Sequence, residues 1–337
     1  MILSKNIILI TAGDPASIST EITIKAIKTK KINENINVIV VTDPNLIEEC
    51  KYLSESNIKI NQIKDKINFT DYEKNCINVI PIQLTKKVKW GKPNQKNFSF
   101  VKFSIITAID TYINSIASAI VTNPINKYTM HKSGFNFEGH TDFLASLSVQ
   151  KKDPVMMLVT NGLRTVPLTI HVPLKKVYKL ITKELIQTKI KIAVKDLKTF
   201  FNIKEPRIIV TGLNPHAGES GDFGDEEIEV IKPAIDELKK INNINIIGPI
   251  SADTAFSLDK RKQYDLAVCM YHDQALIPIK TLNFYNGVNV TLGLDFIRTS
   301  PDHGTGFDIA GKNIANPESL ISAINLAYEM SINKKYA

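Results

Sequence analysis

A mostly apolar run that ends in polar residues occupies positions 117–127, in the stretch ASAIVTNPINK. Its first half is rich in small and β-branched side chains, a composition typical of a strand buried on both faces. Its second half, from Asn123 to Lys127, contains a proline and predicts a loop that leaves the strand at its carboxyl end. Because parallel α/β sheets bind ligands beyond those ends, the stretch predicts an α/β fold with a functional site there.

Similar runs recur along the chain, and amphipathic patterns with apolar residues three and four apart separate many of them. The other predicted strands are residues 6–11, 36–42, 155–160, 164–170, 207–211, 244–247, 265–271 and 288–292. The predicted helices are residues 20–30, 100–115, 182–201, 225–241 and 318–331. This alternation of strands and helices favours a mostly parallel sheet covered by helices.

The composition is that of an ordinary globular protein, with 337 residues, 43% hydrophobic, 23% charged and a formal net charge of +8. It excludes collagen-like, coiled-coil, disulfide-stapled and wholly disordered chains. The cysteines are scattered, and no run reaches the roughly 18 apolar residues that a membrane span needs, so we expect a cytoplasmic protein without membrane association. The lysines are spread along the chain beside Ile and Asn, which disfavours a nucleic-acid partner.

Three histidines closely follow predicted strands, namely His171, His216 and His272. Neutral imidazole is a common ligand of divalent metals, and three protein ligands with an open position make a catalytic site. Each histidine taken alone is more simply a hydrogen-bonded residue at a turn. Their equivalent positions at strand ends favour a shared metal site over that simpler interpretation.

Other polar residues suit a catalytic base or an anion site. Asp253 and Asp273 are candidate bases or partners of the metal ligands, although Asp253 also suits the start of a helix. Fixed positive charge and well-placed donors bind phosphate and carboxylate groups. The candidates for that role are Lys127, His140, Thr141, Lys280, Asn289 and Arg298.

The usual nucleotide-binding fingerprints are absent. The only G-x-G is Gly304-Thr305-Gly306, and no G-x-G-x-x-G follows a predicted strand. The chain also has no G-x-x-x-x-G-K-[ST], no G-x-S-x-G and no H-E-x-x-H motif. The sequence therefore disfavours a standard Rossmann site, a P-loop enzyme and a zincin.

A series of motifs resembles, in order, that of the 4-hydroxythreonine-4-phosphate dehydrogenase family of pyridoxal 5'-phosphate (vitamin B6) biosynthesis. The motifs are TAGDPA at 11–16, TNPINK at 122–127, GHTDFLA at 139–145, GLNPHAGE at 212–219, YHDQ at 271–274 and HGT at 303–305. Together they extend over nearly the whole chain, and several of them are five or more residues long.

The resemblance implies a fold like that of isocitrate and isopropylmalate dehydrogenases, with two α/β/α subdomains flanking a cleft. We expect a cofactor-side subdomain from residues 1–130 and 281–337, and a metal, substrate and dimerisation subdomain from residues 131–280. The resemblance also implies a homodimer with an active site shared between subunits. In this fold NAD or NADP binds without a Rossmann fingerprint, on a loop that corresponds here to His303, Gly304, Thr305 and Asp308.

By the same resemblance, a divalent metal is bound by His171, His216 and His272, with Zn2+ expected and Mg2+ or Co2+ as alternatives. The implied contacts to the phosphorylated substrate are His140, Thr141, Lys280, Asn289 and Arg298. The implied reaction oxidises C3 of 4-phosphohydroxy-L-threonine to 2-amino-3-oxo-4-(phosphonooxy)butanoate, which decarboxylates to 3-amino-2-oxopropyl phosphate. The candidates for the catalytic proton acceptor are Asp253, Asp273 and Lys280.

Three alternative functions stay open at this point. A sister dehydrogenase would act on a four-carbon sugar-acid phosphate, such as threonate or erythronate 4-phosphate. An acyl-phosphate transferase of similar fold would need no set of metal-binding histidines. A non-catalytic protein that binds a phosphate ligand is suggested by Ser17, Ser19 and Ala275, which stand where the family usually has glycine.

Overall fold

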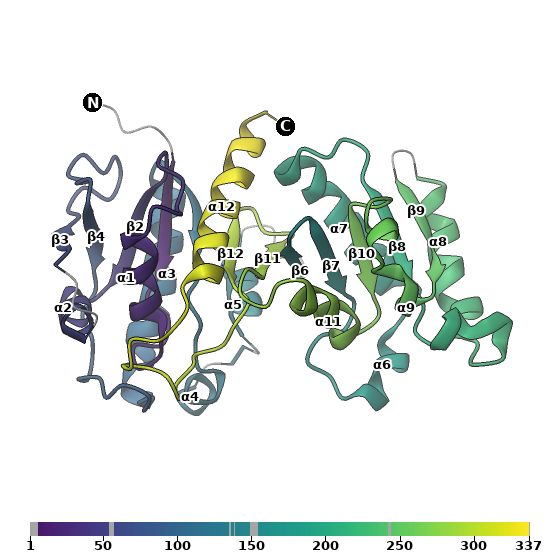
Figure 1. The fold of residues 1–337 in the computed structure, drawn as a ribbon, viewed down its shortest axis with the longest axis horizontal. Coiled ribbons are helices and arrows are strands. Elements are labelled where there is room, and N and C mark those ends of the chain that lie inside the picture. Colours follow the sequence, from purple (N-terminus) through teal and green to yellow (C-terminus); the bar gives the residue numbers. More distant parts are fainter. Residues whose placement is uncertain are drawn as a thin grey trace. The chain divides into compact units, whose positions relative to one another are not determined.

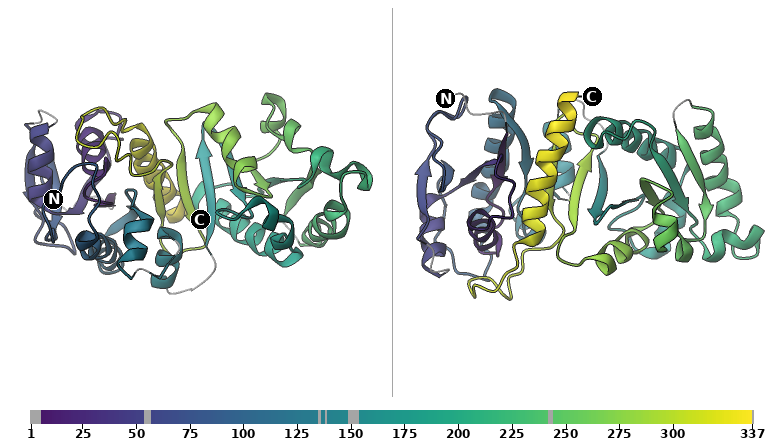
Figure 2. Two further views of the ribbon diagram at one scale, coloured as in Figure 1. Left: turned by 90° about the horizontal axis from the view of Figure 1, so that it is seen from below. Right: turned by 45° about the horizontal axis from the view of Figure 1, so that its top comes forward.

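The computed structural model describes residues 6–53, 57–134, 136–137, 139–148, 154–241 and 244–336. The chain divides into two compact units (Figure 1). Unit 1 consists of Met1–Lys152 and Leu294–Ile332, and unit 2 of Asp153–Gly293 and Asn333–Ala337. In each unit, helices lie on both faces of a set of strands (Figures 1 and 2).

The sheet of unit 1 is entirely parallel among the described strands, as the pattern of buried apolar runs predicts. Its order is β3 (Lys59–Gln62), β4 (Cys76–Pro81), β2 (Asn37–Thr42), β1 (Ile7–Thr11), β5 (Ala117–Val121) and β12 (Arg298–Pro301). Every residue of β1 and β2 is buried, because their side chains pack on helices on both faces.

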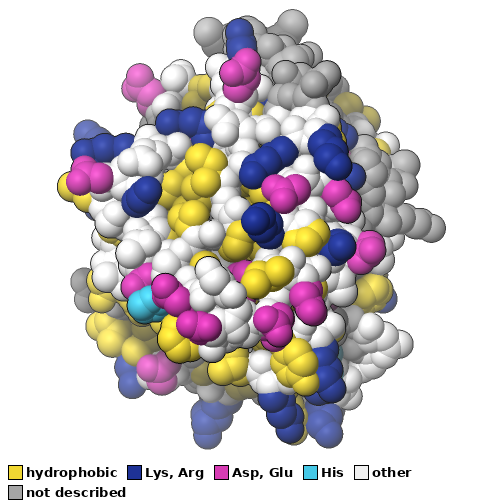
Figure 3. Space-filling view, turned by 90° about the vertical axis from the view of Figure 1, so that its right-hand side faces the viewer, with side chains coloured by type: hydrophobic (Ala, Val, Ile, Leu, Met, Phe, Trp, Pro, Cys, Tyr) yellow, Lys and Arg dark blue, Asp and Glu magenta, His cyan; other side chains and the backbone are white. Residues whose placement is uncertain are grey.

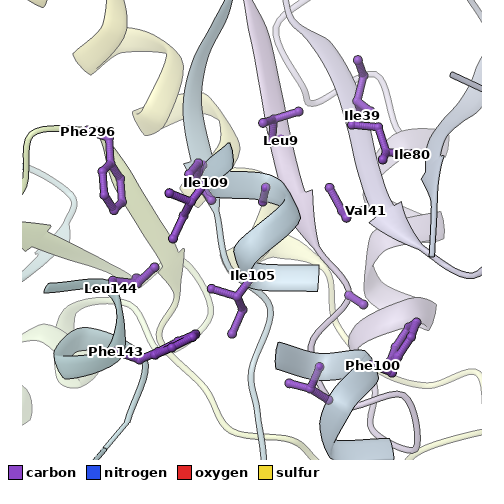
Figure 4. Packing of buried hydrophobic residues seen from close by; sticks show 14 of the residues in the cluster. Leu9, Ile39, Val41, Ile80, Phe100, Ile105, Ile109, Phe143, Leu144 and Phe296 are labelled. Atoms are coloured by element: carbon purple, nitrogen blue, oxygen red, sulfur yellow. The ribbon is translucent and has the colours of Figure 1, made fainter. Parts of the chain in front are cut away.

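The helices of unit 1 enclose a core around α3. They are α1 (Ser19–Lys28), α2 (Pro44–Leu53), η1 (Gln95–Asn97), α3 (Phe98–Asn114), α4 (Lys127–Lys132), α5 (His140–Leu147) and α12 (Glu318–Tyr336). Phe100, Ile105 and Ile109 of α3 pack against Leu9 and other strand side chains in this core (Figure 4). The periodic apolar face of α3 thus covers one side of the sheet and holds the carboxyl ends of its strands in place.

Unit 2 has a mixed sheet in which one strand runs antiparallel to its neighbours, in agreement with the expectation of a mostly parallel sheet. Its order is β11 (Val288–Leu292), β6 (Val155–Thr160), β7 (Leu163–Pro167), β10 (Leu266–Cys269), β8 (Arg207–Thr211) and β9 (Asn245–Ile250). Strand β6 is antiparallel to both β7 and β11, whereas β7, β10, β8 and β9 are parallel. Asn161 and Gly162 form the two-residue turn between β6 and β7, both with positive φ, as a tight hairpin requires.

The helices of unit 2 are α6 (Leu174–Leu180), α7 (Lys183–Phe201), η2 (Pro215–Gly221), η3 (Glu227–Ile231), α8 (Lys232–Lys239), α9 (Ala252–Ala255), α10 (Leu258–Arg261) and α11 (His272–Leu282). Helix α11 packs its buried Ala275 and Ile279 against β6, β7 and β10. Thr182 caps α7 by accepting a hydrogen bond from the Leu185 amide, and Asn202 ends it in a left-handed conformation.

The unit boundaries differ from the expected ones at 130/131 and 280/281. Phe143 and Leu144 of α5 are buried in the core of unit 1, so α5 belongs to that unit. Strand β11 pairs with β6 and therefore belongs to unit 2. Among the described residues, no helix combines the length and apolar character that crossing a membrane requires.

Candidate active site

His171 and His272 come together at the carboxyl ends of two neighbouring strands. His171 follows β7 after Leu168 and Thr169, whose amides donate hydrogen bonds to carbonyls at the end of β10. His272 is the first residue of α11, directly beyond β10. The two imidazole rings have centroids 5.9 Å apart and planes tilted by 43°. This separation is close to the roughly 5–6 Å expected for two imidazoles that bind one zinc ion at about 2 Å.

His216 lies in η2, which follows β8, the strand on the other side of β10. Its side chain is 65% exposed, and its Nδ1 lies 3.0 Å from Oε2 of Glu219. On the face of unit 2 that carries β9 and α8, a histidine side chain stands at the surface among carboxylates (Figure 3). In the described part of the chain, no three His, Cys, Asp or Glu side chains are close enough to hold a metal ion. The structure thus pairs His171 with His272 and does not bring His216 into one set with them.

The backbone that carries His216 is unusual. The five residues from His216 to Ser220 have φ values of 41° to 81°, and only Gly218 among them is a glycine. Left-handed backbone costs other residues roughly 1–2 kcal/mol each. Such strained segments persist where the surrounding structure holds them, and they are frequent at functional sites.

Gln274 joins the strand ends that lead to His216 and to His272. Its Oε1 accepts hydrogen bonds from the Thr211 hydroxyl at 2.9 Å and the Met270 amide at 2.8 Å. Its Nε2 donates to the Gly212 carbonyl at 2.8 Å. Gln274 was not among the predicted site residues, although its position directly after the pair His272-Asp273 at a strand end was a usable signal.

The two candidate carboxylates have different surroundings. Asp273 Oδ1 lies 2.7 Å from Nδ1 of His272, the arrangement in which a carboxylate orients a metal-binding imidazole. Asp253 accepts a hydrogen bond from the Ser251 hydroxyl, and this bond holds the pKa of the Asp253 carboxyl below its usual range. A lowered pKa makes Asp253 a weaker base near neutral pH.

Lys280 and Asn289 are the predicted substrate contacts in unit 2. Lys280 follows His272 by eight residues in α11 and is therefore on a similar face about two turns later. Its Nζ lies 5.2 Å from the centroid of the Phe284 ring. Asn289 lies in β11, and its buried Oδ1 accepts no hydrogen bond from any described group. A buried acceptor of this kind is stabilised when a ligand supplies a donor.

Arg298 is the first residue of β12 in unit 1 and is only 3% exposed. Its Nε donates to the Thr122 hydroxyl at 3.0 Å, which ties β12 to the end of β5. Burial lowers the pKa of Arg298 to about 9. His140 and Thr141 begin α5, and their side chains lie outside the described part of the structure.

The predicted cofactor loop belongs to unit 1 and packs on two other loops. The Thr305 carbonyl accepts a hydrogen bond from the Ile18 amide at 3.1 Å. A Cβ atom on Gly91 would lie 2.6 Å from the Phe307 carbonyl oxygen, so this neighbouring turn approaches the loop closely. Nothing lies within 4 Å of the position of a Cβ atom on Gly304. The other two predicted cofactor-binding residues are His303 and Asp308. The Nδ1 atom of His303 lies 2.9 Å from the Gly304 carbonyl oxygen.

Asp14 is a further candidate that was not among the predicted site residues. It lies just beyond β1 and is 5% exposed, with Oδ1 accepting a hydrogen bond from the Ala16 amide at 2.9 Å. Burial raises the pKa of the Asp14 carboxyl to about 6. The sequence did indicate Asp14 as a site residue, because Asp14 follows a buried strand just as the three predicted metal-binding histidines do.

Comparisons with known proteins agree over nearly the whole chain. Residues 34–327 match the family model described as Pyridoxal phosphate biosynthetic protein PdxA. The chain is 42% identical over 328 residues to a 4-hydroxythreonine-4-phosphate dehydrogenase of Methylorubrum populi, covering 96% of this chain and 93% of that protein. It is 41% identical over 327 residues to a protein of the same name from Zymomonas mobilis, with 97% and 96% covered.

A solved structure gives the same result. The crystal structure of 4-hydroxythreonine-4-phosphate dehydrogenase from Klebsiella pneumoniae has a TM-score of 0.86 and 35% sequence identity, covering 97% of this chain and 99% of that one. With the two α/β units, these similarities define the class of the protein as an oxidoreductase. The chain belongs to the pyridoxal phosphate biosynthetic protein PdxA family. The predicted α/β fold and the family resemblance are therefore confirmed.

Proposed function

We propose that this protein oxidises the C3 alcohol of 4-phosphohydroxy-L-threonine in a metal-dependent reaction with NAD or NADP. The C3 alcohol would lose a hydride, for which NAD or NADP would be the acceptor, and a proton, which a base of this chain would accept, giving 2-amino-3-oxo-4-(phosphonooxy)butanoate. This β-keto acid loses CO2 to give 3-amino-2-oxopropyl phosphate, a step of vitamin B6 biosynthesis in the cytoplasm. The observation that carries the proposal is the pairing of His171 and His272 at adjacent strand ends in a chain of this family.

His171, His216 and His272 would hold the divalent ion, with Zn2+ the best match for imidazole and Mg2+ or Co2+ as alternatives. The chemistry of these side chains suits a metal, because the Nδ1 atoms of His216 and His272 each face a carboxylate and leave Nε2 as the ligand atom. Within the described chain His216 stands apart from the pair His171 and His272, so the proposal requires that it join them at the ion. Bound there, the ion supplies a Lewis acid that lowers the pKa of the substrate alcohol.

NAD or NADP would bind along His303, Gly304, Thr305 and Asp308, and when bound it supplies the hydride acceptor. The open space at Gly304 supports this assignment, since a ligand can approach the backbone closely there. The hydrogen bond between Ile18 and Thr305 supports it as well, because it orders the loop before a ligand arrives.

The chain's own side chains would bind and orient the substrate. Lys280 and Arg298 supply positive charge for its phosphate and carboxylate, together with the start of α5 at His140 and Thr141. Asn289 supplies a buried acceptor for the substrate's ammonium or hydroxyl group. The proton acceptor is one of Asp253, Asp273 and Lys280, and the lowered pKa of Asp253 argues against that residue.

A spectrophotometric assay of NADH or NADPH formation tests the proposal. Purified protein is given 4-phosphohydroxy-L-threonine or D-threonate 4-phosphate, with and without a chelator. We expect cofactor reduction with the amino substrate only, lost with chelator and restored by added Zn2+. Faster turnover of the threonate ester would reassign the protein to sugar-acid phosphates. A lack of reduction with both substrates in the presence of metal would contradict the proposed activity.

We also propose that the protein is a homodimer with a shared active site, as the resemblance implies. Analytical ultracentrifugation would show a single species of twice the chain mass. Mixing a His216→Ala variant with an Arg298→Ala variant would restore part of the activity if the two residues serve the same site from different subunits. A monomer at assay concentrations that retains full activity would contradict this arrangement.

A further inference from the structure

A buried carboxylate lies beneath the left-handed segment that carries His216. Glu227 is the first residue of η3, a single π-helical turn, and is only 3% exposed. Its Oε1 accepts hydrogen bonds from the backbone amides of Leu213 at 2.6 Å and Asn214 at 2.8 Å. Its Oε2 accepts a hydrogen bond from Asn214 Nδ2 at 3.0 Å. These three donors belong to the two residues that lead into Pro215 and His216.

The backbone closes tightly around this carboxylate. A Cβ atom on Gly218 would lie 2.8 Å from Glu227 Oε2, and one on Gly212 would lie 3.0 Å from Oε1. A Cβ atom on Gly212 would also lie 2.7 Å from the Ala217 Cα. The left-handed segment is therefore folded back against Glu227, with glycine at the points of closest approach.

This arrangement explains how an unfavourable backbone persists. His216, Ala217, Glu219 and Ser220 are not glycine, and none of them is stable in left-handed backbone without outside support. Glu227 supplies that support through three hydrogen bonds that its buried carboxyl group accepts from the residues before the turn. The same turn places Glu219 Oε2 3.0 Å from Nδ1 of His216, so the backbone conformation also sets the orientation of the imidazole.

We propose that Glu227 is a positioning residue that holds the His216 segment in its left-handed conformation and so presents His216 as a metal ligand. The metal part of this inference rests on the proposed function, whereas the conformational part does not. Glu227 acts through the backbone, since its contacts are with Leu213, Asn214 and the turn that they begin.

The test compares Glu227→Gln with Glu229→Gln. Glu229 lies in the same π-helical turn but is exposed, so its substitution makes the same chemical change without removing the contacts. In metal-free protein, hydrogen–deuterium exchange of residues 212–221 should be at least about tenfold faster in Glu227→Gln than in wild type, and unchanged in Glu229→Gln. The affinity for Co2+, read from its visible absorption, should fall about 10–100-fold in Glu227→Gln only.

A milder variant covers the case in which Glu227→Gln does not fold. Asn214→Ala removes the side-chain contact with Glu227 at 3.0 Å, together with the hydrogen bond to Glu226 at 2.7 Å, and leaves both backbone contacts, so it should show the same changes at smaller size. Exchange and Co2+ affinity that equal wild type in Glu227→Gln would overturn the inference. If wild-type protein binds no Co2+, the proposed metal function fails, and the exchange measurement still decides the conformational role of Glu227.

Discussion

Trp90 and Gly311 are packed so closely in unit 1 that a Cβ atom on Gly311 would lie 2.7 Å from the Cβ of Trp90. Gly311 has a φ of +75°, in the left-handed region that favours glycine. Trp90 is the only tryptophan in the chain and stands beside the proposed cofactor loop. Its fluorescence therefore reports on that loop without any engineered label.

Titration with NADH or NADPH should quench Trp90 emission to saturation. The reason is that reduced nicotinamide absorbs light in the range where indole emits, so binding beside Trp90 brings the two groups within energy-transfer distance. The measurement is emission at fixed excitation, with Trp90→Phe as the control that removes the signal. Unchanged emission at cofactor concentrations that support turnover would place the cofactor elsewhere.

Gly311→Ala should lower the free energy of unfolding by about 1–3 kcal/mol, because the new methyl group meets Trp90 and the backbone conformation is unfavourable for alanine. At Gly304, in the same loop, a new methyl group would enter open space, so Gly304→Ala should change the free energy of unfolding by less than about 0.5 kcal/mol. Urea denaturation of both variants without cofactor gives the comparison. Equal stabilities would show that the loop rearranges freely around Trp90.

Asp14→Asn should stabilise the protein at neutral pH and not in acid. Because burial raises the pKa of Asp14 to about 6 in the folded state, the native protein keeps a proton that the unfolded chain releases near pH 4. Stability is therefore lost as pH rises from about 4 to about 6, by about 1–3 kcal/mol. Asn does not titrate and avoids this loss. The free energy of unfolding of Asp14→Asn should therefore exceed that of wild type at pH 7.5 and equal it at pH 3.5.

Asp65→Asn is the control with the opposite pH dependence. Hydrogen bonds from the Asn68 amide and the Thr70 hydroxyl hold the pKa of the Asp65 carboxyl below its usual range. The contribution of Asp65 to stability is present above the pKa of the unfolded state and is lost as pH falls through the pKa of the folded state. Asp65→Asn should therefore destabilise the protein at pH 7.5. Denaturation curves at both pH values measure both variants. If the stabilities of Asp14→Asn and Asp65→Asn changed with pH in the same direction relative to wild type, the raised pKa of the buried Asp14 would be contradicted.

Asp273→Asn should weaken metal binding about 10–100-fold, because the amide orients His272 less strongly than the carboxylate at 2.7 Å. The matched control is Asp259→Asn, which alters a carboxylate that is 90% exposed. Competition with a chromophoric chelator measures the affinity. Unchanged affinity with a large fall in kcat would instead identify Asp273 as the catalytic base.

Arg298→Ala should raise KM by about 10–100-fold, since a buried guanidinium forms strong bonds to an anionic substrate. His216→Ala should change KM far less and abolish metal-dependent turnover. Thr122→Val, which removes the acceptor that positions Arg298, should have an intermediate effect on KM. Steady-state kinetics with added Zn2+ separates the cases, and equal effects of Arg298→Ala and His216→Ala would contradict the proposed roles.

Much of the fold could be predicted from the sequence, because buried strands such as β1 and β5 are continuous apolar runs. Strand β3 was not predicted, since it is half exposed and has no such run. Helix α11 was not predicted either, since it contains Pro278 and follows a strand without a clear break. The hairpin between β6 and β7 was not predicted, although Asn161-Gly162 between the two predicted strands is a turn signal.

The candidate site was predictable in its residue types and not in its arrangement. The pairing of His171 with His272 depends on β7 lying beside β10, and the order of strands in a sheet is not written in local sequence. The left-handed turn at His216 could not be foreseen, because His, Ala, Glu and Ser have no preference for that conformation. The conformation of this turn depends instead on Glu227, whose carboxyl group accepts hydrogen bonds from the residues that precede the turn.

Unit 1 is built from two stretches of chain that flank residues 153–293 of unit 2, and this affects how the protein emerges from a ribosome. Strand β5 is synthesised before residues 153–293, whereas its neighbour β12 is synthesised after them. At roughly 5–20 residues per second, the intervening chain takes on the order of ten seconds to translate. During that interval the nascent sheet presents an unpaired hydrogen-bonding edge at β5, the kind of edge that chaperones and aggregates both recognise.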